Sequence, residues 1–335
     1  MTNQGKTIND LQINEFIEQN NFGEAAKRLL KIQKDTWQTL SSNYNSLQQI
    51  KTKIIRFDGF SLVIQFNPGR YVSSSALVDE KSIINRKCFL CLEHLPEEQE
   101  GIIIKDYILL ANPYPIFPEH LTISNLKHRN QSIKDSFRDL LFFSRILSEY
   151  YTIFYNGPQC GASAPDHLHF QAGSKNVMPL DSEYALIKNK YGEILSKTNN
   201  CTVLAIDDKL RKIISIEGDH ENIINNIFDI FYSEYSSGSD FVEPLMNIIC
   251  SYYENTGWRI NIMLRAKHRP KEYFLEGEER VIFSPAACDY GGLCITPMEK
   301  DFNRFDGPLL NKIFAETSIS ENQFQILKDG LKAKL

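Results

Sequence analysis

The chain lacks long hydrophobic runs. None of its 335 residues falls in an apolar run of about 20, the length that a membrane-spanning helix needs. The polar start, Met1 to Gly5, also lacks the apolar stretch of a secretory signal. The seven cysteines are an odd number, which in a chain without a signal favours free thiols over a disulfide framework. We therefore expect a cytoplasmic protein with no membrane contact.

The composition also lacks an excess of positive charge. Lysine and arginine number 37 against 42 acidic residues, so the net charge is −5. Proteins that bind nucleic acid usually carry a basic patch or stripe, and we therefore expect no nucleic-acid partner. A nucleotide-sized ligand stays compatible, because its phosphates need only a few local cations. The composition does not indicate an oligomeric state.

Periodicity divides the chain into helical and extended segments. Residues 9 to 49 have the apolar spacing of helices, with a break at Gly23. Hairpins are predicted around Asp58-Gly59 and around residues 255–257. From residue 133 to 154 the apolar positions predict one long helix ahead of a strand. An antiparallel sheet with helices across it follows, although no sequence repeat is visible.

The most informative segment is His167-Leu168-His169-Phe170-Gln171, which follows a turn rich in Gly, Ser and Pro at residues 161–165. In a strand, alternate side chains share one face. His167, His169 and Gln171 would therefore point at one ligand, while Leu168, Phe170 and Ala172 face the core. The alternative is a solvated strand on which two histidines alternate without a ligand.

This segment is similar to the His-x-His-x-Gln active-site strand of the histidine-triad-like superfamily. With glutamine in the third place it resembles the branch of galactose-1-phosphate uridylyltransferases, dinucleoside tetraphosphate phosphorylases and GDP-hexose phosphorylases. Three further segments occur in the order that this branch uses: Phe66 to Arg70, Cys88 to Cys91, and Asn112 to His120. The resemblance covers about residues 55 to 175.

The resemblance implies an α+β fold with two lobes, in which antiparallel sheets are packed by helices. Residues 1–50 would be an added helical segment, residues 51–180 the catalytic lobe, and residues 181–335 a second, degenerate lobe.

The spacing Cys88-x-x-Cys91 places two thiols close enough to bind one metal ion, and a structural zinc needs four such nitrogen or sulfur ligands. The resemblance nominates His120 and His167 for the remaining two positions. His94, three residues after Cys91, is a rival ligand. The alternative is that the two cysteines only pack in the interior. His128 and His220 lie in polar segments and are interpreted as solvated.

The resemblance also implies catalytic roles. His169 would be the nucleophile that attacks the α-phosphorus of a nucleotide, since a neutral imidazole is nucleophilic at neutral pH. Gln171 favours a transferase or phosphorylase, because water-using hydrolases carry histidine there. The phosphate would be held by groups that donate hydrogen bonds or carry positive charge, namely Ser163, the turn at Gly161, Asn156, Asn67 and Arg70.

Two features remain ambiguous. Arg265 and Lys267 belong to the densest cationic cluster of the second lobe, which suits a sugar phosphate or free phosphate, but the cluster also fits a solvated face. The uridylyltransferases have Gly-Cys-Ser-Asn-Pro directly before the first histidine, whereas this chain has Ala162 in place of the cysteine and an additional Asp166 after Pro165. Asp166 therefore weakens the metal role assigned to His167.

We interpret the chain as a nucleotidyltransferase or phosphorylase with a structural zinc ion and a nucleotidyl-histidine intermediate. The substrate would be a nucleoside diphosphate sugar, with a GDP-sugar favoured, or a dinucleoside polyphosphate. The acceptor would be inorganic phosphate or a sugar phosphate. The alternatives are a nucleotide hydrolase of the same superfamily and a nonenzymatic, zinc-stabilised nucleotide-binding protein.

Overall fold

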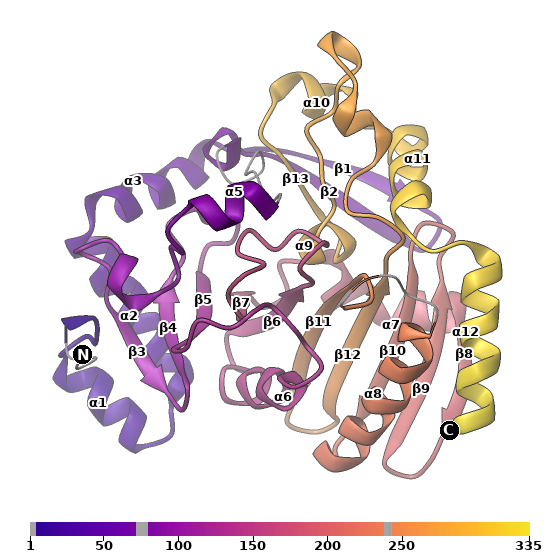
Figure 1. Cartoon of the computed structure of the whole chain (residues 1–335), viewed down its shortest axis with the longest axis horizontal. Coiled ribbons are helices and arrows are strands. Elements are labelled where there is room, and N and C mark those ends of the chain that lie inside the picture. Colours follow the sequence, from indigo (N-terminus) through magenta and orange to yellow (C-terminus); the bar gives the residue numbers. More distant parts are fainter. Residues whose placement is uncertain (1–4, 72–79, 238–240, 242) are drawn as a thin grey trace.

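The computed structural model describes residues 5–71, 80–237, 241 and 243–335. Ten strands form one large sheet in which every neighbouring pair is antiparallel (Figure 1). In spatial order these are β3 (Gly101–Ile104), β4 (Tyr107–Ala111), β5 (His120–Asn125), β7 (His169–Ser174), β6 (Tyr151–Asn156), β11 (Met246–Tyr253), β12 (Gly257–Leu264), β10 (Lys212–Gly218), β9 (Cys201–Asp207) and β8 (Gly192–Lys197). The expected α+β fold with antiparallel sheets is confirmed.

The two halves of this sheet have the same strand order. From the central β6–β11 pair outward, the order is β6-β7-β5-β4-β3 on one side and β11-β12-β10-β9-β8 on the other. In each half a helix connects the third and fourth strands along the chain, α6 (Phe137–Ile146) in the first and α8 (Glu221–Ser236) in the second. The repeated topology has no counterpart in a visible sequence repeat.

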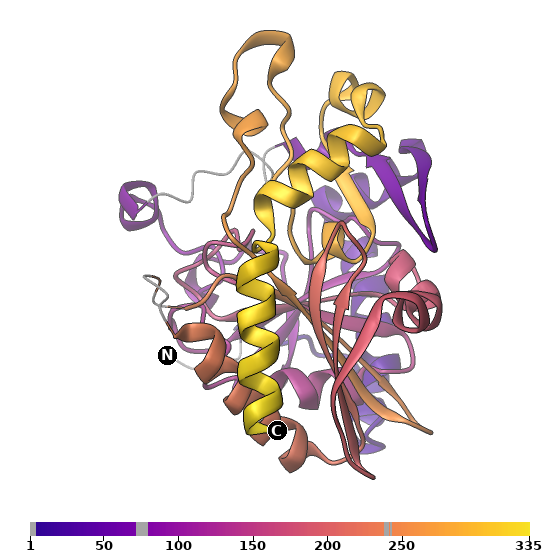
Figure 2. The same cartoon turned by 90° about the vertical axis from the view of Figure 1, so that its right-hand side faces the viewer.

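Helices cover one face of the large sheet. Helices α6, α8 and α12 (Glu321–Lys334) lie along this face (Figures 1 and 2). In the main core, α6 packs against the central strands β6 and β11, α8 packs against β10, and α12 packs against α8 and the edge strand β8. The rings of Phe137 on α6 and Phe228 on α8 stack with centroids 3.7 Å apart and so join the two halves. At one edge, α2 packs against β3 and β4. The N-terminal helices are α1 (Leu11–Glu18), α2 (Phe22–Thr36), α3 (Gln38–Ser46) and the 3-10 turn η2 (Leu47–Gln49).

A second, smaller sheet lies over the opposite face. Its order is β1-β2-β13, with β1 and β2 antiparallel and β13 parallel to β2. A separate core joins this sheet to α7 (Pro179–Tyr191), α9 (Ala287–Tyr290), α10 (Glu299–Arg304) and α11 (Gly307–Thr317). The strands of the sheet are β1 (Lys51–Phe57), β2 (Phe60–Phe66) and β13 (Leu293–Thr296). The other elements are α5 (Glu80–Asn85) and the short 3-10 turns η3 (Pro68–Arg70), η4 (Leu92–His94), η5 (Lys271–Phe274) and η6 (Gly277–Glu279).

Most predicted elements are confirmed, including the hairpins β1–β2 and β11–β12. The long helix predicted for residues 133–154 is wrong in its second part: α6 ends at Ile146, and Tyr151–Asn156 form strand β6. All six residues of β6 are buried, because cores pack on both faces of this central strand. A strand buried on both faces is continuously apolar and does not alternate, so its periodicity cannot distinguish it from a helix.

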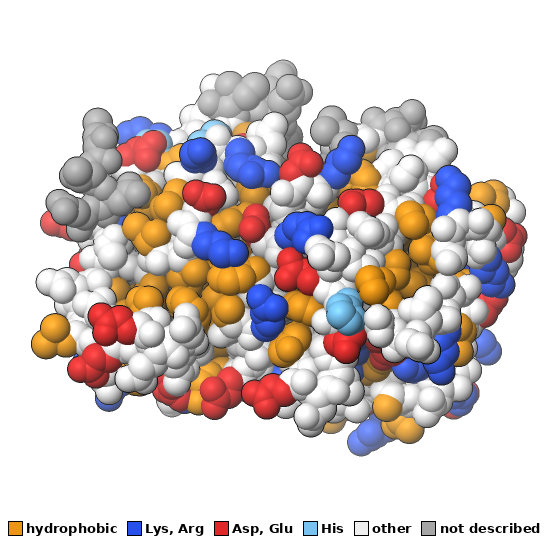
Figure 3. Space-filling view, turned by 90° about the horizontal axis from the view of Figure 1, so that it is seen from below, with side chains coloured by type: hydrophobic (Ala, Val, Ile, Leu, Met, Phe, Trp, Pro, Cys, Tyr) orange, Lys and Arg blue, Asp and Glu red, His pale blue; other side chains and the backbone are white. Residues whose placement is uncertain are grey.

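The surface seen from below the view of Figure 1 carries acidic and basic side chains interspersed among apolar ones (Figure 3). The described residues on this face therefore form no extended patch of one charge. Among the described residues, the helices are all too short or too polar to cross a membrane.

Replacing Phe228 by Ala should remove the stacked contact that joins α6 to α8. Deletion of a large buried aromatic side chain costs roughly 3–5 kcal/mol, so we expect the free energy of unfolding measured by denaturant titration to fall by about that amount. The control is Asn226→Ala, an exposed position on the same helix. A loss below about 1 kcal/mol for Phe228→Ala would contradict this packing role.

Candidate active site

A cavity of about 820 Å³ lies between the two sheets' elements and draws its walls from both halves of the chain. The catalytic candidates His169 and Gln171 line it, together with the turn at Gly161–Ser163. The opposite wall comes from residues 268–295, which follow strand β12. Trp37 and Thr39 of the N-terminal helical segment also line the cavity. The sequence motif therefore lies in a concave site that distant segments complete.

The side chains around strand β7 alternate as predicted, with one correction: His167 does not point at the same ligand as His169 and Gln171, because its ring lies against Cys88 and Cys91. Leu168, Phe170 and Ala172 are buried in the core beneath α6, whereas His169 and Gln171 face the cavity. The Nδ1–H of His169 donates to the backbone oxygen of His167 at 2.8 Å, which leaves Nε2 as the ring nitrogen with a free lone pair. Burial lowers the pKa of His169 to about 4. The imidazole is thus neutral at physiological pH, the state that a nucleophile requires.

Gln131 holds the backbone of His169 at a point where two strands separate. Regular pairing of β6 with β7 extends only to Phe154 and Gln171. Beyond it, the side-chain amide of Gln131 accepts from the N–H of His169 at 2.8 Å and donates to the oxygens of His169 and Asn156 at 3.0 and 2.9 Å. Sequence reasoning missed this residue, because a glutamine in a loop carries no local signal of such a role.

The turn at Gly161 packs against the second half of the chain. Gly161 has φ +97°, and a Cβ at this position would lie 2.6 Å from the Cβ of Ala286. Only glycine fits both the backbone conformation and the space. Nearby, Asn156 Oδ1 accepts from Asn247 Nδ2 at 2.8 Å and from the N–H of Ala287 at 2.9 Å. These contacts hold the wall formed by residues 284–288 against the first half of the chain.

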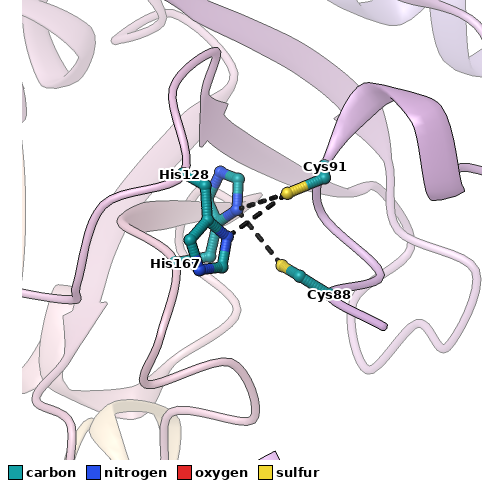
Figure 4. Close-up of side chains that lie close together, drawn as sticks. All are labelled: Cys88, Cys91, His128 and His167. Carbon is teal, nitrogen blue, oxygen red and sulfur yellow. Dashed lines mark hydrogen bonds between the residues drawn. The ribbon is translucent and has the colours of Figure 1, made fainter. Parts of the chain in front are cut away.

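A group of four side chains beside the catalytic strand could hold a metal ion (Figure 4). One ligand atom from each of Cys88, Cys91, His128 and His167 lies within 4.8 Å of the others. The Sγ–Nδ1 distances are 3.2 Å for Cys88–His167, 3.3 Å for Cys91–His128 and 3.6 Å for Cys91–His167. Bonds of about 2.0–2.3 Å to a tetrahedral zinc place ligand atoms roughly 3.3–3.8 Å apart, so the group fits such an ion.

The state of these side chains also suits a metal. Burial beside Cys88 raises the pKa of Cys91 to about 12, so two adjacent thiolates are disfavoured without a cation. Burial lowers the pKa of His167, which keeps its ring neutral and able to bind a metal through Nδ1. Its Nε2–H donates to the backbone oxygen of Asn125 at 2.8 Å, the type of outer contact that fixes a ligating imidazole.

The expected metal set is corrected at one position. His128 was interpreted as solvated from the sequence, but its ring approaches the cysteines. His120 does not belong to the group. His120 lies on β5 with its Nε2 2.9 Å from Gln171 Oε1, while His128 lies in the loop after β5. The rival His94 binds the backbone oxygen of Cys88 through Nδ1 at 2.9 Å, although it lies near Cys91 in a second possible group with Glu93.

Two arginines of the first half contribute positive charge to the cavity wall. Arg70 lines the cavity and donates from Nη1 to the backbone oxygen of Tyr114 at 2.7 Å. Arg86, which the sequence analysis missed, also lines the cavity and forms an ion pair with Asp166 at 2.5 Å. Within the described part of the chain, Arg86 Nη1 is buried without a hydrogen-bond partner. The additional Asp166 therefore fixes a cavity arginine.

Three predicted substrate-binding residues have other roles. Asn67 is buried and donates to the backbone oxygen of Pro115 at 3.3 Å, so it shapes the loop before β5. Arg265 is 2 % exposed, and its guanidinium donates to Asn247 Oδ1 and to the backbone oxygens of Thr317, Pro285, Lys267 and His268. Lys267 is exposed and pairs with Glu316 at 2.8 Å. From this cationic cluster, His268 and Arg269 line the cavity instead.

Comparison with solved structures identifies the architecture. Yeast Ap4A phosphorylase Apa2 superposes with a TM-score of 0.54 and 14% identity, over 84% of this chain and 94% of that one. Its complex with AMP gives a TM-score of 0.53 and 15% identity, over 84% and 95%. The chain has the fold of Ap4A phosphorylase.

The other comparisons do not indicate a function. A family model described as a domain of unknown function (DUF4922) matches residues 29–174, which include the metal group and the catalytic strand. A DUF4931 family protein from Bacillus cereus superposes with a TM-score of 0.38 and 16% identity, over 49% of this chain and 84% of that one. No curated protein sequence matches the chain.

The metal group predicts which substitutions abolish metal binding. Cys88→Ser and His128→Ala should each lower the metal content of the purified protein, because each removes one of four ligands. His120→Phe should leave the metal content unchanged. Elemental analysis of protein purified without chelator measures this directly. Normal metal content in His128→Ala together with its loss in His120→Phe would restore the original assignment.

Proposed function

We propose that the chain is a nucleotidyltransferase of the phosphorylase type, which splits a dinucleoside polyphosphate through a covalent intermediate on His169. The observation that carries this proposal is the geometry of His169, whose buried, neutral ring is oriented by a hydrogen bond from Nδ1 to the oxygen of His167 and lines the cavity. The fold shared with Ap4A phosphorylase supports the same reaction class.

In the first step, the lone pair of His169 Nε2 attacks the α-phosphorus and forms a P–N bond. The bond between that phosphorus and its bridging oxygen breaks, and the electron pair leaves with that oxygen on the departing nucleoside polyphosphate. The ring becomes positively charged, and its Nδ1–H stays hydrogen-bonded to the oxygen of His167. Groups fixed before the reaction can then stabilise the charge of the transition state, and Ser163, Arg70 and Arg86 line the cavity for this purpose.

In the second step, an oxygen of inorganic phosphate attacks the same phosphorus and the P–N bond breaks. The electron pair returns to His169, the neutral ring is restored, and a nucleoside diphosphate is released. Among the candidates for the acceptor, phosphate is favoured over water because Gln171 carries an amide, which cannot take up a proton as a general base. A nucleotide hydrolase is therefore the less supported alternative.

The size and composition of the cavity favour a substrate larger than one nucleotide. Pockets for small molecules are typically about 300–1,000 Å³, and this one is about 820 Å³ with walls from both halves of the chain. Apolar and aromatic residues such as Trp37, Phe89 and Leu110 share the wall with the phosphate-binding candidates. A dinucleoside polyphosphate fits this description and the fold comparison, whereas nucleotide sugars are the second candidate.

We further propose that the metal is zinc and that its role is structural. Two thiols and two imidazoles are the ligand set that zinc prefers in closed tetrahedral sites. Cys88, Cys91, His128 and His167 would hold it, and the bound ion would fix the loop of the cysteines to the start of β7. The oxygen of His167 then stays in place for His169.

The covalent intermediate can be trapped. Mixing the protein with diadenosine tetraphosphate labelled at the α-phosphates, without phosphate, should leave acid-labile, base-stable label on the protein. His169→Ala should abolish this labelling because it removes the attacking nitrogen, and Gln171→His should increase the share of product formed with water. Retained turnover in His169→Ala, with no label trapped in the wild type, would refute double displacement.

Arg70→Ala should lower kcat/KM on the true substrate. Loss of a charge-assisted hydrogen bond costs about 1.5–3 kcal/mol, and the residue lines the cavity at an intermediate exposure. The matched control is Lys267→Ala, since this cation is exposed and paired with Glu316. Equal kcat/KM values for the two variants would remove Arg70 from the site, and a lowered melting temperature in Arg70→Ala alone would indicate a structural role.

A further inference from the structure

We propose that His120 is a positioning residue that fixes the amide of Gln171 with its NH2 group toward the cavity. This inference rests on the proposed function, because it gives Gln171 a donor role toward the phosphate that is being transferred. It also assigns a role to the histidine that the metal group leaves out.

Backbone geometry determines which nitrogen of His120 carries the proton. The N–H of Ile116 points at His120 Nδ1 across 3.4 Å, and a backbone N–H can only donate. Nδ1 must therefore accept, and the proton of the neutral ring lies on Nε2. Burial and the nearby Arg70 lower the pKa of His120 to about 3, so the ring is neutral at physiological pH.

The tautomer of His120 in turn determines the orientation of Gln171. His120 Nε2 lies 2.9 Å from Gln171 Oε1, so the protonated nitrogen donates to the amide oxygen. A flipped amide would place its NH2 group against the N–H of the ring, two donors facing each other. The NH2 group of Gln171 is therefore directed away from His120, and the side chain lines the cavity. Two hydrogen bonds thus connect the Ile116 backbone to a donor beside the nucleophile.

The ring of His120 is itself immobilised. It packs between Phe117 and Phe154, with ring centroids 5.4 and 6.0 Å away, and it is fully buried. Its backbone is held from the other side by Tyr44, whose hydroxyl donates to the oxygen of His120 at 2.9 Å. Because a fixed donor needs no reorganisation during the reaction, the orientation of Gln171 should affect turnover more than binding of the substrate.

The first test measures the tautomer without any activity. Long-range nitrogen–proton NMR spectra of the ¹⁵N-labelled wild type at pH 7, assigned with His120→Phe, should show a neutral His120 with its proton on Nε2. A proton on Nδ1, or a charged ring, would overturn the proposal. The NMR result tests the tautomer independently of activity. If no nucleotide is turned over, the proposed function is refuted, and the tautomer of His120 is still determined.

The second test separates positioning from packing. His120→Phe keeps a ring between Phe117 and Phe154 but removes the donor to Gln171. With diadenosine tetraphosphate and phosphate, kcat should fall about tenfold, while KM and metal content stay within about twofold of the wild type. In a Gln171→Ala background the same substitution should change kcat less than twofold, because its effect passes through Gln171.

A merely structural role predicts the opposite pattern. His120→Phe would then lower kcat equally in both backgrounds, and this additivity would refute the proposal while leaving the proposed function intact. His94→Phe is the matched control, a histidine on the cavity wall whose Nδ1 binds the backbone oxygen of Cys88 instead of Gln171. Its effect on kcat should be the same with and without Gln171.

Discussion

The candidate site depends on one hydrogen bond, from His169 Nδ1 to the backbone oxygen of His167. This bond orients the imidazole and determines which ring nitrogen is free. Its acceptor oxygen would also stabilise the positive charge that the ring gains during the proposed reaction. The acceptor lies on a residue whose side chain approaches Cys88 and Cys91, so a bound metal would hold the same backbone in place. Gln131 completes the support where β6 and β7 separate. The Cys/His group, the start of β7 and the proposed nucleophile His169 are therefore structurally coupled.

The second half of the chain contributes a wall rather than a second motif. After β12, the buried guanidinium of Arg265 donates hydrogen bonds to the backbone oxygens of residues 267, 268, 285 and 317. These bonds place the segment 268–288 over the half of the chain that carries His169. Ala286 packs so closely against Gly161 that a Cβ on residue 161 would clash with it. The cavity exists because these two segments meet, so substitutions at Arg265 should act through its shape.

The local parts of the site could be predicted from the sequence, whereas the contacts between distant segments could not. Alternation at residues 167–171 placed Leu168 and Phe170 in the core and His169 toward a ligand, because a strand has a strict period of two. The choice between His120 and His128 as metal ligand depended on the path of β5 and its following loop, which no spacing encodes. Arg265 was interpreted as part of a cationic surface, whereas its charge is buried by backbone oxygens that include those of Pro285 and Thr317, two residues distant in the sequence. The repeated topology of the two halves is not accompanied by a visible sequence repeat, because many combinations of apolar residues can fill the same core positions.

The central claim is that the nucleotidyl group is transferred twice, first to His169 and then to the acceptor. The stereochemical course at the α-phosphorus tests this claim most directly, with a dinucleoside polyphosphate that carries a chiral phosphorothioate at that position and inorganic phosphate as acceptor. Each in-line displacement inverts the configuration at phosphorus. Two displacements therefore predict overall retention in the nucleoside diphosphate product, and inversion would show a single direct transfer and contradict the account.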